Sequence, residues 1–451
     1  MEGLINEIEE KVARRCLEHA LSSGADKARV TLSKNLTELY GTLNGKLDKV
    51  SRSMDRALSI SIFANGRYGN FSANRLEEKE LFPFIEKAVK TVGTLAKDPC
   101  RDLPDPSRTE KGAVRGDELG LLDKKYGDIS SDDRLSIALE ATAYGKVKDS
   151  RFKVISEEGD YSDSIADSLI IDSNGLYCRH GETSFDYGVE TTIEDGKGNR
   201  ISGYWWDSSP WLDGLDAGAC GLAAVRRAAS LIGPSPIKGG PMTVVIENTC
   251  ASTVLNPILT ALGGFSLQQK NSFMDGTLGK KIFPDALTIL DKGREFGKAG
   301  ARLFDSEGVS VKEVPIIDKG VVNEYFINTY ISNKMGIAPT VDDASRPVVL
   351  PAGDDVSLPL DRERILSLCG DCVLVTGFNG GNSNPTTGDF SFGIEGILFR
   401  DGKPAHPVRE LLMTGNIITL WNNLLYAGSD PRPCMSKQIP TLAFGNVVLS
   451  A

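Results

Sequence analysis

The chain has few of the residues from which hydrolytic metal sites are built. Its 451 residues include only three histidines, His19, His180 and His406, far apart in the sequence. A zinc peptidase usually presents two histidines one helical turn apart, with a glutamate as the base. The spacing therefore predicts structural positions for all three: His19 on an amphipathic helix, His180 between strands and His406 in a turn.

Basic clusters, targeting signals and long apolar runs are also scarce. The net charge is −10 and the pI is about 5.1, which argues against nucleic-acid binding because that function needs a concentrated basic face. The N-terminus lacks the basic start and apolar run of a secretory signal, and no apolar stretch approaches the ~20 residues that span a bilayer. With eight widely spaced cysteines, the sequence predicts a cytoplasmic chain with reduced thiols and no membrane contact.

Motifs for nucleophilic or nucleotide chemistry are missing as well. We find neither a G-x-S-x-G elbow nor a phosphate-binding loop with its lysine. Cys369 and Cys372 form one C-x-x-C, which suits a redox pair or half a zinc site. Without a second such motif, the pattern favours small residues at the entry of a buried strand.

The residues that are present predict an α+β protein of two or three domains. Helical spacing of apolar residues indicates helices over 3–22 and 76–92, and the Asn-Gly pairs at 44–45 and 65–66 mark hairpins between them. This helix–meander–helix unit covers 1–96. A connector rich in proline and charge follows over 97–127.

The same order recurs in a second α+β unit over 128–235. A helix capped by Ser130 or Ser131 precedes strands with turns at 174–175 and 195–199, and a helix over 217–231 ends the unit. The remainder, 236–451, reads as a strand-rich C-terminal domain with one helix near 252–262. We expect NEYFINTYI, residues 323–331, to be one of its strands.

Two places in the C-terminal part are candidates for contact with a ligand or partner. The first is the glycine- and asparagine-rich stretch 376–396, where absent Cβ atoms let another backbone approach and amides can bond to an extended peptide. A structural turn between strands explains the same composition, so both interpretations stay open. The candidate peptide-binding or interface residues here are Asn379, Gly380, Gly381, Asn382, Asn384, Thr387, Gly388 and Asp389.

The second candidate is FDSEG, residues 304–308. Asp305 and Glu307 lie two apart and would share one side of an extended segment, where they could bind a hard cation or orient a backbone. An aspartate in D-x-x-G more often caps a turn through its own side chain.

Several segments, taken together and in order, resemble the TldD/PmbA family, also called modulators of DNA gyrase. They are ISIFANGRYGNFSAN, LIIDSNGL, NSFMDGTLGKKI, FDSEGV, IIDKGVVNEYFIN and NPTTGDFSFGIEGILFRDGKPAHPV. In that family a TldD-like branch carries a zinc motif of the His-Glu-x-x-x-His kind, and a PmbA-like branch, also called TldE, lacks it. The branches associate into a complex that cleaves unfolded or extended peptides.

At the place of the zinc motif this chain reads ENTCASTVLNPILTALGG, residues 247–264, without histidine. The resemblance thus implies the PmbA-like branch: a subunit with no catalytic residue, metal or cofactor of its own, a zinc-bearing TldD-like partner, and a peptide or unfolded protein as substrate. Cys434 lies in a region comparable to that of a cysteine that the zinc branch uses as a ligand.

Three alternatives remain at the level of sequence. The chain could be a stand-alone peptide- or protein-binding module or a homodimer. It could be a hydrolase using Cys434 or the pair of Asp305 and Glu307. It could act on DNA gyrase or nucleic acid, although the acidic charge disfavours contact with DNA.

Overall fold

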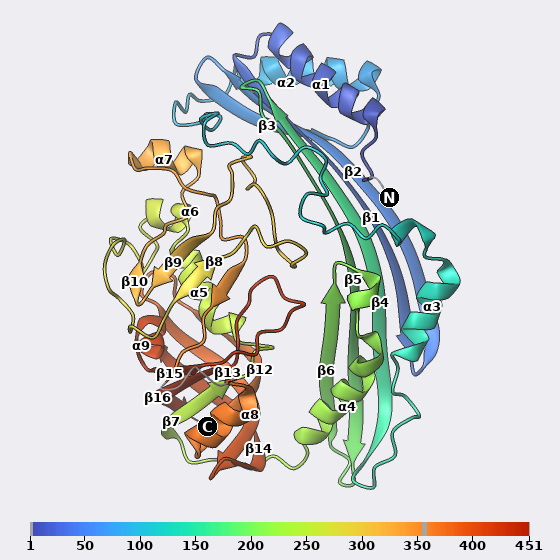
Figure 1. Cartoon of the computed structure of the whole chain (residues 1–451), viewed down its shortest axis with the longest axis vertical. Coiled ribbons are helices and arrows are strands. Elements are labelled where there is room, and N and C mark those ends of the chain that lie inside the picture. Colours follow the sequence, from blue (N-terminus) through green and yellow to red (C-terminus); the bar gives the residue numbers. More distant parts are fainter. Residues whose placement is uncertain (1–2, 354–358, 451) are drawn as a thin grey trace.

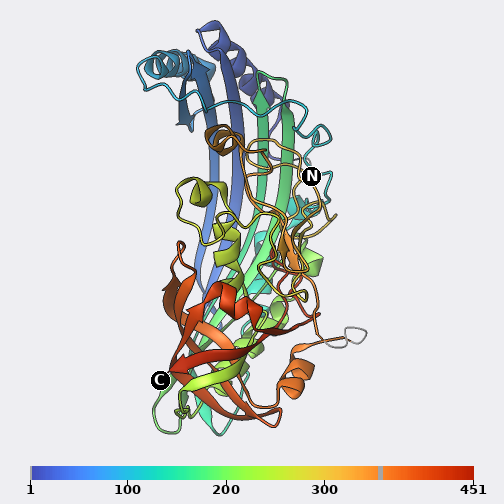
Figure 2. The same ribbon diagram turned by 90° about the vertical axis from the view of Figure 1, so that its left-hand side faces the viewer.

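The N-terminal half of the protein is built around one long, curved antiparallel sheet (Figures 1 and 2). The computed structural model describes residues 3–353 and 359–450. The strand order is β3-β2-β1-β4-β5-β6, so strands of both predicted N-terminal units share the sheet. The junction is the pairing of β1 with β4, which runs from Arg29 opposite Asp172 to Leu43 opposite Glu158. The strands are β1 Lys27–Leu43, β2 Lys46–Ala64, β3 Arg67–Ala73, β4 Phe152–Asp172, β5 Tyr177–Asp195 and β6 Arg200–Ser209.

Both Asn-Gly pairs form the predicted hairpin turns. Asn44 and Gly45 have φ angles of 52° and 73°, and Asn65 and Gly66 have φ angles of 53° and 70°. Positive φ at both central positions gives a turn whose twist matches that of the flanking strands. These turns set the register of β1 with β2 and of β2 with β3.

Helices cover one face of this sheet. They are α1 Glu7–Ser22, α2 Glu78–Val92, α3 Ser131–Glu140 and α4 Cys220–Ser230, which confirms the predicted N-terminal helices. The side chains of Cys16 on α1, Leu32 on β1, Ile60 on β2 and Ile85 on α2 are completely buried in one cluster beneath the first two helices. At the other end, α4 packs directly on β6, where a Cβ at Gly203 would overlap the backbone of α4.

The C-terminal part contains a six-stranded sheet of order β14-β13-β12-β7-β16-β15 and a smaller sheet of order β10-β9-β8-β11. Its core includes the fully buried Trp421, whose indole N–H donates to the carbonyl of Val254 at 3.0 Å. The elements are β7 Gly240–Ile246, α5 Ser252–Ala261, α6 Gly264–Gln268, β8 Ile289–Asp291, β9 Val314–Asp318, β10 Val321–Val322, α7 Thr329–Met335, β11 Pro347–Val349, α8 Arg362–Cys369, β12 Cys372–Ser383, β13 Asp389–Arg400, β14 Lys403–Asn416, α9 Ile417–Asn422, β15 Leu424–Ala427 and β16 Leu442–Ser450.

The α+β prediction is confirmed, and Cys372 begins the buried strand β12 as expected. The predicted strand over residues 323–331 is wrong, because α7 begins within it at Thr329. The side chain of Asn328 accepts the backbone N–H of Ile331, so a helix N-cap ends the extended segment. Across residues 3–353 and 359–450, no helix combines the length and apolarity needed to cross a membrane.

The connector between the N-terminal units attaches the sheet to the C-terminal part. The carboxylate of Glu110 accepts hydrogen bonds from Arg294 and Ser310, both at 2.7 Å, and from the backbone N–H of Gly112. Burial alone would raise the pKa of Glu110, but these donors outweigh it and lower the pKa to about 2. The ionised carboxylate therefore stabilises the folded state.

We expect Glu110→Gln to lower the free energy of unfolding by roughly 1–3 kcal/mol near neutral pH, because Arg294 loses its buried counter-charge. The stabilisation by Glu110 is present above its unfolded pKa of about 4.5 and is lost as the pH falls towards its folded pKa of about 2. The gap between wild type and variant in urea unfolding should therefore close over that range. Asp285→Asn, which removes an exposed ion pair with Lys281, is the control and should change little.

Candidate interdomain site

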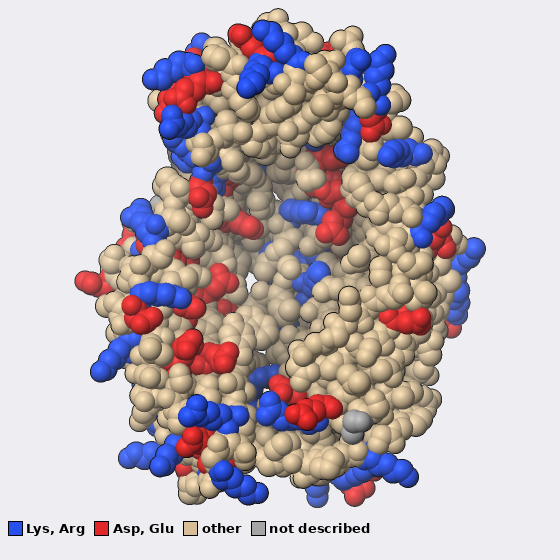
Figure 3. All heavy atoms as spheres, turned by 180° about the vertical axis from the view of Figure 1, so that it is seen from behind, with Lys and Arg blue, Asp and Glu red and all other residues tan. Residues whose placement is uncertain are grey.

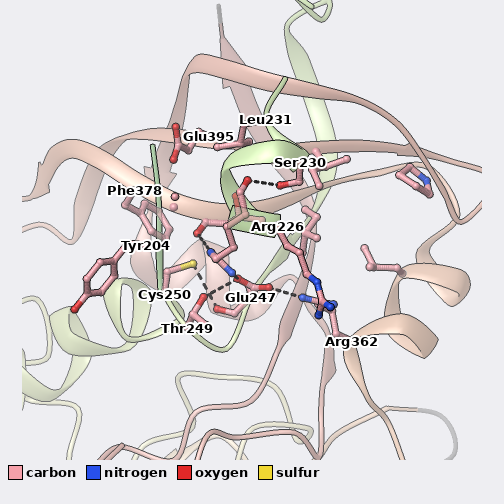
Figure 4. A pocket seen from close by; sticks show the side chains of 18 of the residues that line it. Tyr204, Arg226, Ser230, Leu231, Glu247, Thr249, Cys250, Arg362, Phe378 and Glu395 are labelled. Atoms are coloured by element: carbon pink, nitrogen blue, oxygen red, sulfur yellow. Dashed lines mark hydrogen bonds and ion pairs between the residues drawn. The ribbon is translucent and has the colours of Figure 1, made fainter. Parts of the chain in front are cut away.

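A cavity of about 830 Å³ lies between the sheet of the N-terminal half and the sheet of the C-terminal part. Its walls come from β6 and α4 on one side and from α8, β12, β13 and the end of β7 on the other. Figure 4 shows Tyr204, Arg226, Glu247, Arg362 and Phe378 around this space. The cavity therefore exists only when the two parts are packed together.

Glu247 is the central charged group of the cavity. Only 3% of its side chain is exposed, and it accepts hydrogen bonds from Arg227 of α4 at 2.7 Å, from Arg362 of α8 and from the hydroxyl of Thr249 at 2.7 Å. Burial acts to raise the pKa of Glu247, but the guanidinium of Arg227 and the other donors outweigh it, so the pKa is lowered. The carboxylate is thus a permanent anion that joins α4, β7 and α8.

Arg227 extends this junction to the neighbouring strand. Its second terminal nitrogen donates to the carbonyl of Thr376 on β12 at 2.8 Å, and its guanidinium lies 5.3 Å from the ring centre of Trp205. Because Glu247 is held ionised by these partners, it is poorly suited to take up a proton as a general base near neutral pH.

Cys250 lies beside Glu247 but has no character of a nucleophile. Its sulfur is 3.5 Å from the carbonyl oxygen of Glu247 and 3.6 Å from that of Val375. Burial, and then the negative charge of Glu247, raise the pKa of the thiol to about 12. The thiol therefore stays protonated, whereas attack requires a thiolate.

The rim of the cavity offers groups that can contact a ligand. Tyr204 and Trp206 of β6 stack with ring centres 5.7 Å apart, and Tyr204 is half exposed. Arg226 of α4 is exposed and has no ion pair within the described residues. Among the described strands β6 pairs only with β5, so the backbone groups at its other edge take no part in strand pairing, although the carbonyl of Trp206 accepts from Arg432.

A zinc site, which the metallopeptidase resemblance raises, does not fit these residues. The helix after Glu247, α5, buries the apolar side chains of Val254, Leu255, Ile258 and Leu259 and carries no histidine. Among the residues that the structure describes, no three His, Cys, Asp or Glu side chains are grouped as metal ligands. We therefore assign no chemical step to a metal held by this chain.

The three histidines occupy separate places. His19 stacks on Phe82 with ring centres 4.3 Å apart. His180 lies 3.4 Å from a carboxylate oxygen of Glu182, and the ring of His406 lies 3.0 Å from the carbonyl of Pro407. His19 lies on helix α1 as predicted, but the predicted places of the other two are wrong: His180 lies within β5, opposite Ser168, and His406 lies within β14, opposite Leu398.

The stretch 376–396 forms a hairpin of β12 and β13, and only one end of this hairpin borders the cavity. Its base lines the cavity through Thr376, Gly377, Phe378 and Glu395, whereas its tip lies outside the lining. The base of this hairpin, and not the candidate residues at its tip, therefore borders the cavity. The candidate tip residues that lie outside the lining are Asn379, Gly380, Gly381, Asn382, Asn384, Thr387, Gly388 and Asp389.

Hydrogen bonds within the tip are those of a structured turn. The side chain of Asn384 accepts the N–H of Thr386 at 2.9 Å, and Asp389 accepts from the hydroxyl of Thr387 at 2.7 Å and from the amide of Asn416 at 2.9 Å. Asn379 and Asn382 are exposed, and contact of either with a peptide stays a prediction.

Asp305 and Glu307 lie in a turn that joins the C-terminal part to the large sheet, and neither lines the cavity. Glu307 accepts from the N–H and hydroxyl of Thr329, both at 2.8 Å, and its backbone carbonyl accepts from Arg29 of β1 at 2.7 Å. Asp305 accepts the N–H groups of Val309 and Asp342 at 2.9 and 3.0 Å. Both carboxylates therefore serve as turn and contact groups in this structure.

Cys434 belongs to a loop that docks on β6. Burial is the largest effect on its thiol and raises the pKa. Two residues away, the guanidinium of Arg432 lies 4.4 and 4.3 Å from the ring centres of Trp205 and Trp206. This stacking holds the loop against the N-terminal sheet.

Sequence reasoning missed Arg226, Arg227, Tyr204 and Arg362 as lining residues. They come from segments far apart in the chain and belong to no local motif. Of the lining residues discussed here, only Glu247 could have been found from the sequence. It is the first residue of the stretch 247–264, which stands where the TldD-like branch carries its zinc motif.

The pH dependence of Asp305 can be tested directly. Burial, followed by the charge of Asp342, raises the pKa of Asp305 to about 6 from 3.8. Its raised pKa stabilises the fold below pH 3.8, and this contribution is lost as the pH rises through about 6. We expect the unfolding free energy to fall by roughly 3 kcal/mol from this residue over that range. In urea unfolding, Asp305→Asn should lack this slope, and parallel profiles for the two proteins would refute the assignment.

Two family models match the chain. The PmbA/TldA metallopeptidase central domain matches residues 124–232, and the C-terminal domain of the same family matches residues 239–451. The metalloprotease PmbA of Escherichia coli O157:H7 is 25% identical over 430 residues, which covers 92% of each chain.

Solved structures agree with these matches. The crystal structure of a proposed modulator of DNA gyrase from Bacteroides thetaiotaomicron is 36% identical, with a TM-score of 0.94 over 99% of this chain and 100% of its own. TldE from Thermococcus kodakarensis shares the fold, with a TM-score of 0.84 over 98% of this chain and 100% of its own at 17% identity. The chain therefore belongs to the TldD/PmbA family of metallopeptidases.

Proposed function

We propose that this chain is the non-metal subunit of a TldD/PmbA-type metalloprotease complex, and that it holds extended peptides for a zinc-bearing, TldD-like partner. The observation that carries the proposal is the chemistry of the cavity. Its central carboxylate is neutralised by Arg227 and Arg362, and the adjoining helix α5 is apolar. A cavity of this kind can bind and orient a chain, but hydrolysis needs a group that activates water.

The edge of β6 that pairs with no other described strand supports an extended peptide as the ligand. Ser202, Gly203, Tyr204 and Trp206 of this strand all line the cavity. An extended chain that adds to a strand edge bonds through its backbone, so binding depends little on its sequence. The rings of Tyr204 and Trp206 provide apolar contacts for its side chains, and Arg226 provides a cation for an acidic side chain or a terminal carboxylate.

The sheet face that is turned towards the C-terminal part is polar. Ser53, Thr37, Ser164 and Ser184 lie side by side across β2, β1, β4 and β5. Figure 3 shows the hollow between the two parts, with side chains of both charges along it. Hydroxyl groups can donate to or accept from any peptide backbone, which suits a surface that holds varied chains.

Reconstitution tests the proposal. The purified chain should contain substoichiometric zinc and should not cleave a fluorescently labelled unfolded polypeptide. Mixed with a TldD-like protein from the same genome, it should form a complex whose cleavage is abolished by a chelator and restored by zinc. Zinc-dependent cleavage by this chain alone, or the same activity from the partner with and without it, would refute the assignment.

Peptide contact at β6 has a separate test. Tyr204→Ala should weaken binding of an extended peptide about tenfold, equivalent to ~1.4 kcal/mol, because an exposed aromatic contact is removed. The fluorescence of Trp206, which lies in the cavity, offers a binding signal. Phe265→Ala, at an exposed aromatic of α6 outside the cavity, is the matched control. Equal affinities of wild type and both variants would exclude β6 from the peptide site.

A further inference from the structure

A second, smaller cavity lies at the end of the strand order that is remote from β6. It has a volume of about 70 Å³, and its walls come from β1, β2 and β3, from the connector and from the C-terminal part near α7 (Figure 1). One water molecule needs about 10–15 Å³ of such space, so the smaller cavity has room for a group of roughly five atoms. The lining residues that decide its chemistry are Arg29, Tyr68, Arg101, Asp102, Glu307 and Tyr330.

Arg101 of the connector brings to this cavity a cation whose N–H groups are not used by the protein. Its guanidinium carbon lies 3.5 Å from the ring centre of Tyr330 and 5.0 Å from that of Tyr68. Stacking on a ring occupies a face of the guanidinium and leaves the in-plane N–H groups to bond elsewhere. Within residues 3–353 and 359–450 this guanidinium donates no hydrogen bond, and its ion pair with Asp98 is loose at 3.9 Å.

Arg29 of β1 is the second cation, and only part of its guanidinium is used. Both of its hydrogen bonds come from Nη2, one to the carboxylate of Asp172 at 3.3 Å and one to the backbone carbonyl of Glu307 at 2.7 Å. Its Nε–H is buried and has no acceptor in the part of the chain that the structure describes. A buried N–H without an acceptor costs free energy, and an anion that accepts from this guanidinium offsets that cost.

The two carboxylate residues of the lining already have partners. Asp102 accepts from Nζ of Lys27 at 2.6 Å and from the N–H of Leu103 at 2.7 Å, so its charge is neutralised. The carboxylate of Glu307 is bonded to Thr329 but has no cationic partner among the described residues. The charges of the lining therefore nearly cancel, and recognition of a ligand rests on the unused N–H groups.

We propose that the smaller cavity binds a small oxyanion, a phosphate or carboxylate group, between Arg101 and Arg29. Guanidinium groups are the usual partners of both kinds of group, because their parallel N–H donors match two oxygens. Since Arg29 also bonds to Glu307 of the C-terminal part, the anion fastens the connector to the junction of the two parts. This site shares no described lining residue with the cavity beside β6, and it does not rest on the function proposed above.

Thermal unfolding of the full chain in inorganic phosphate tests the site. Phosphate should raise the unfolding midpoint and then saturate, whereas sodium chloride at the same ionic strength should not. Because the charges of the lining nearly cancel, we expect a dissociation constant in the millimolar range. Arg101→Gln should raise it at least tenfold. Arg115→Gln, which changes an exposed arginine of the same connector outside the cavity, is the matched control.

An equal response of the wild type to phosphate and chloride would overturn the proposal. Equal dissociation constants for Arg101→Gln and Arg115→Gln would also overturn it. Circular dichroism verifies that each variant is folded.

Glu307→Gln separates anion binding from a purely structural effect. The variant removes the carboxylate of the lining that has no cationic partner, and its amide oxygen can still accept from Thr329. With less repulsion, phosphate should bind several-fold more tightly than to the wild type. A variant that only weakened the fold would not gain affinity, so weaker or unchanged binding would contradict the site.

A free inorganic anion and the carboxylate end of a peptide offer the same chemistry. An N-acetylated dipeptide with a free C-terminal carboxylate, and its C-terminal amide, separate these sources. Stabilisation by the free acid alone identifies a peptide carboxylate, and stabilisation by neither identifies an inorganic anion. Equal stabilisation by both forms would overturn recognition of an oxyanion, because the amide carries no charge.

A crystal of the wild-type chain soaked in selenate locates the anion and does not depend on any variant. The anomalous signal of selenium should lie beside Arg29 and Arg101, with selenate oxygens within about 2.7–3.2 Å of their nitrogens. A signal elsewhere and none at this place would overturn the site. Selenate bound here without any stabilisation by phosphate in solution would make it an adventitious ion only, which also refutes the proposal.

Discussion

The pairing of β1 with β4 is the contact on which the rest of the structure depends. It joins strands separated by more than a hundred residues, from Arg29 opposite Asp172 to Leu43 opposite Glu158. Without it, each N-terminal unit would keep only a small sheet with an exposed edge. With it, the sheet is long enough to reach from the connector contacts at Glu110 to β6 beside the C-terminal part. The interdomain cavity beside β6, and the polar sheet face that is turned towards the C-terminal part, both depend on this extended sheet.

The electrostatics of the cavity explain why a member of a metallopeptidase family can be suited to binding. A buried carboxylate is costly unless it is paired, and Glu247 is paired twice. Its two arginines come from α4 and α8, so the same charges that fix its ionisation also hold the two parts of the chain together. The charges of Glu247, Arg227 and Arg362 thus serve the contact between the two parts, and the proposed ligand contacts rest on Arg226 and Tyr204.

The two edges of the large sheet face different surroundings. The β6 edge faces the C-terminal part and lines the interdomain cavity. From Lys49 to Ala57, β2 is paired with β1 alone among the described strands, and its residues up to Arg56 are exposed. One fold thus offers strand edges of different accessibility, and the surroundings of each edge determine what can pair with it.

The features of this protein that the sequence predicts are those that depend on interactions between residues close together in the chain. Apolar spacing marks the helices, Asn-Gly pairs mark the turns, and the lack of clustered histidines argues against a zinc site, because each depends on neighbouring residues. Composition could not locate α7, where the cap by Asn328 overrides strand-forming residues. The cavity could not be predicted from the sequence either, because its residues meet only after three distant segments have packed. These residues are Glu247, Arg227, Arg362 and Tyr204. Long-range pairing, which no local pattern encodes, brings them together.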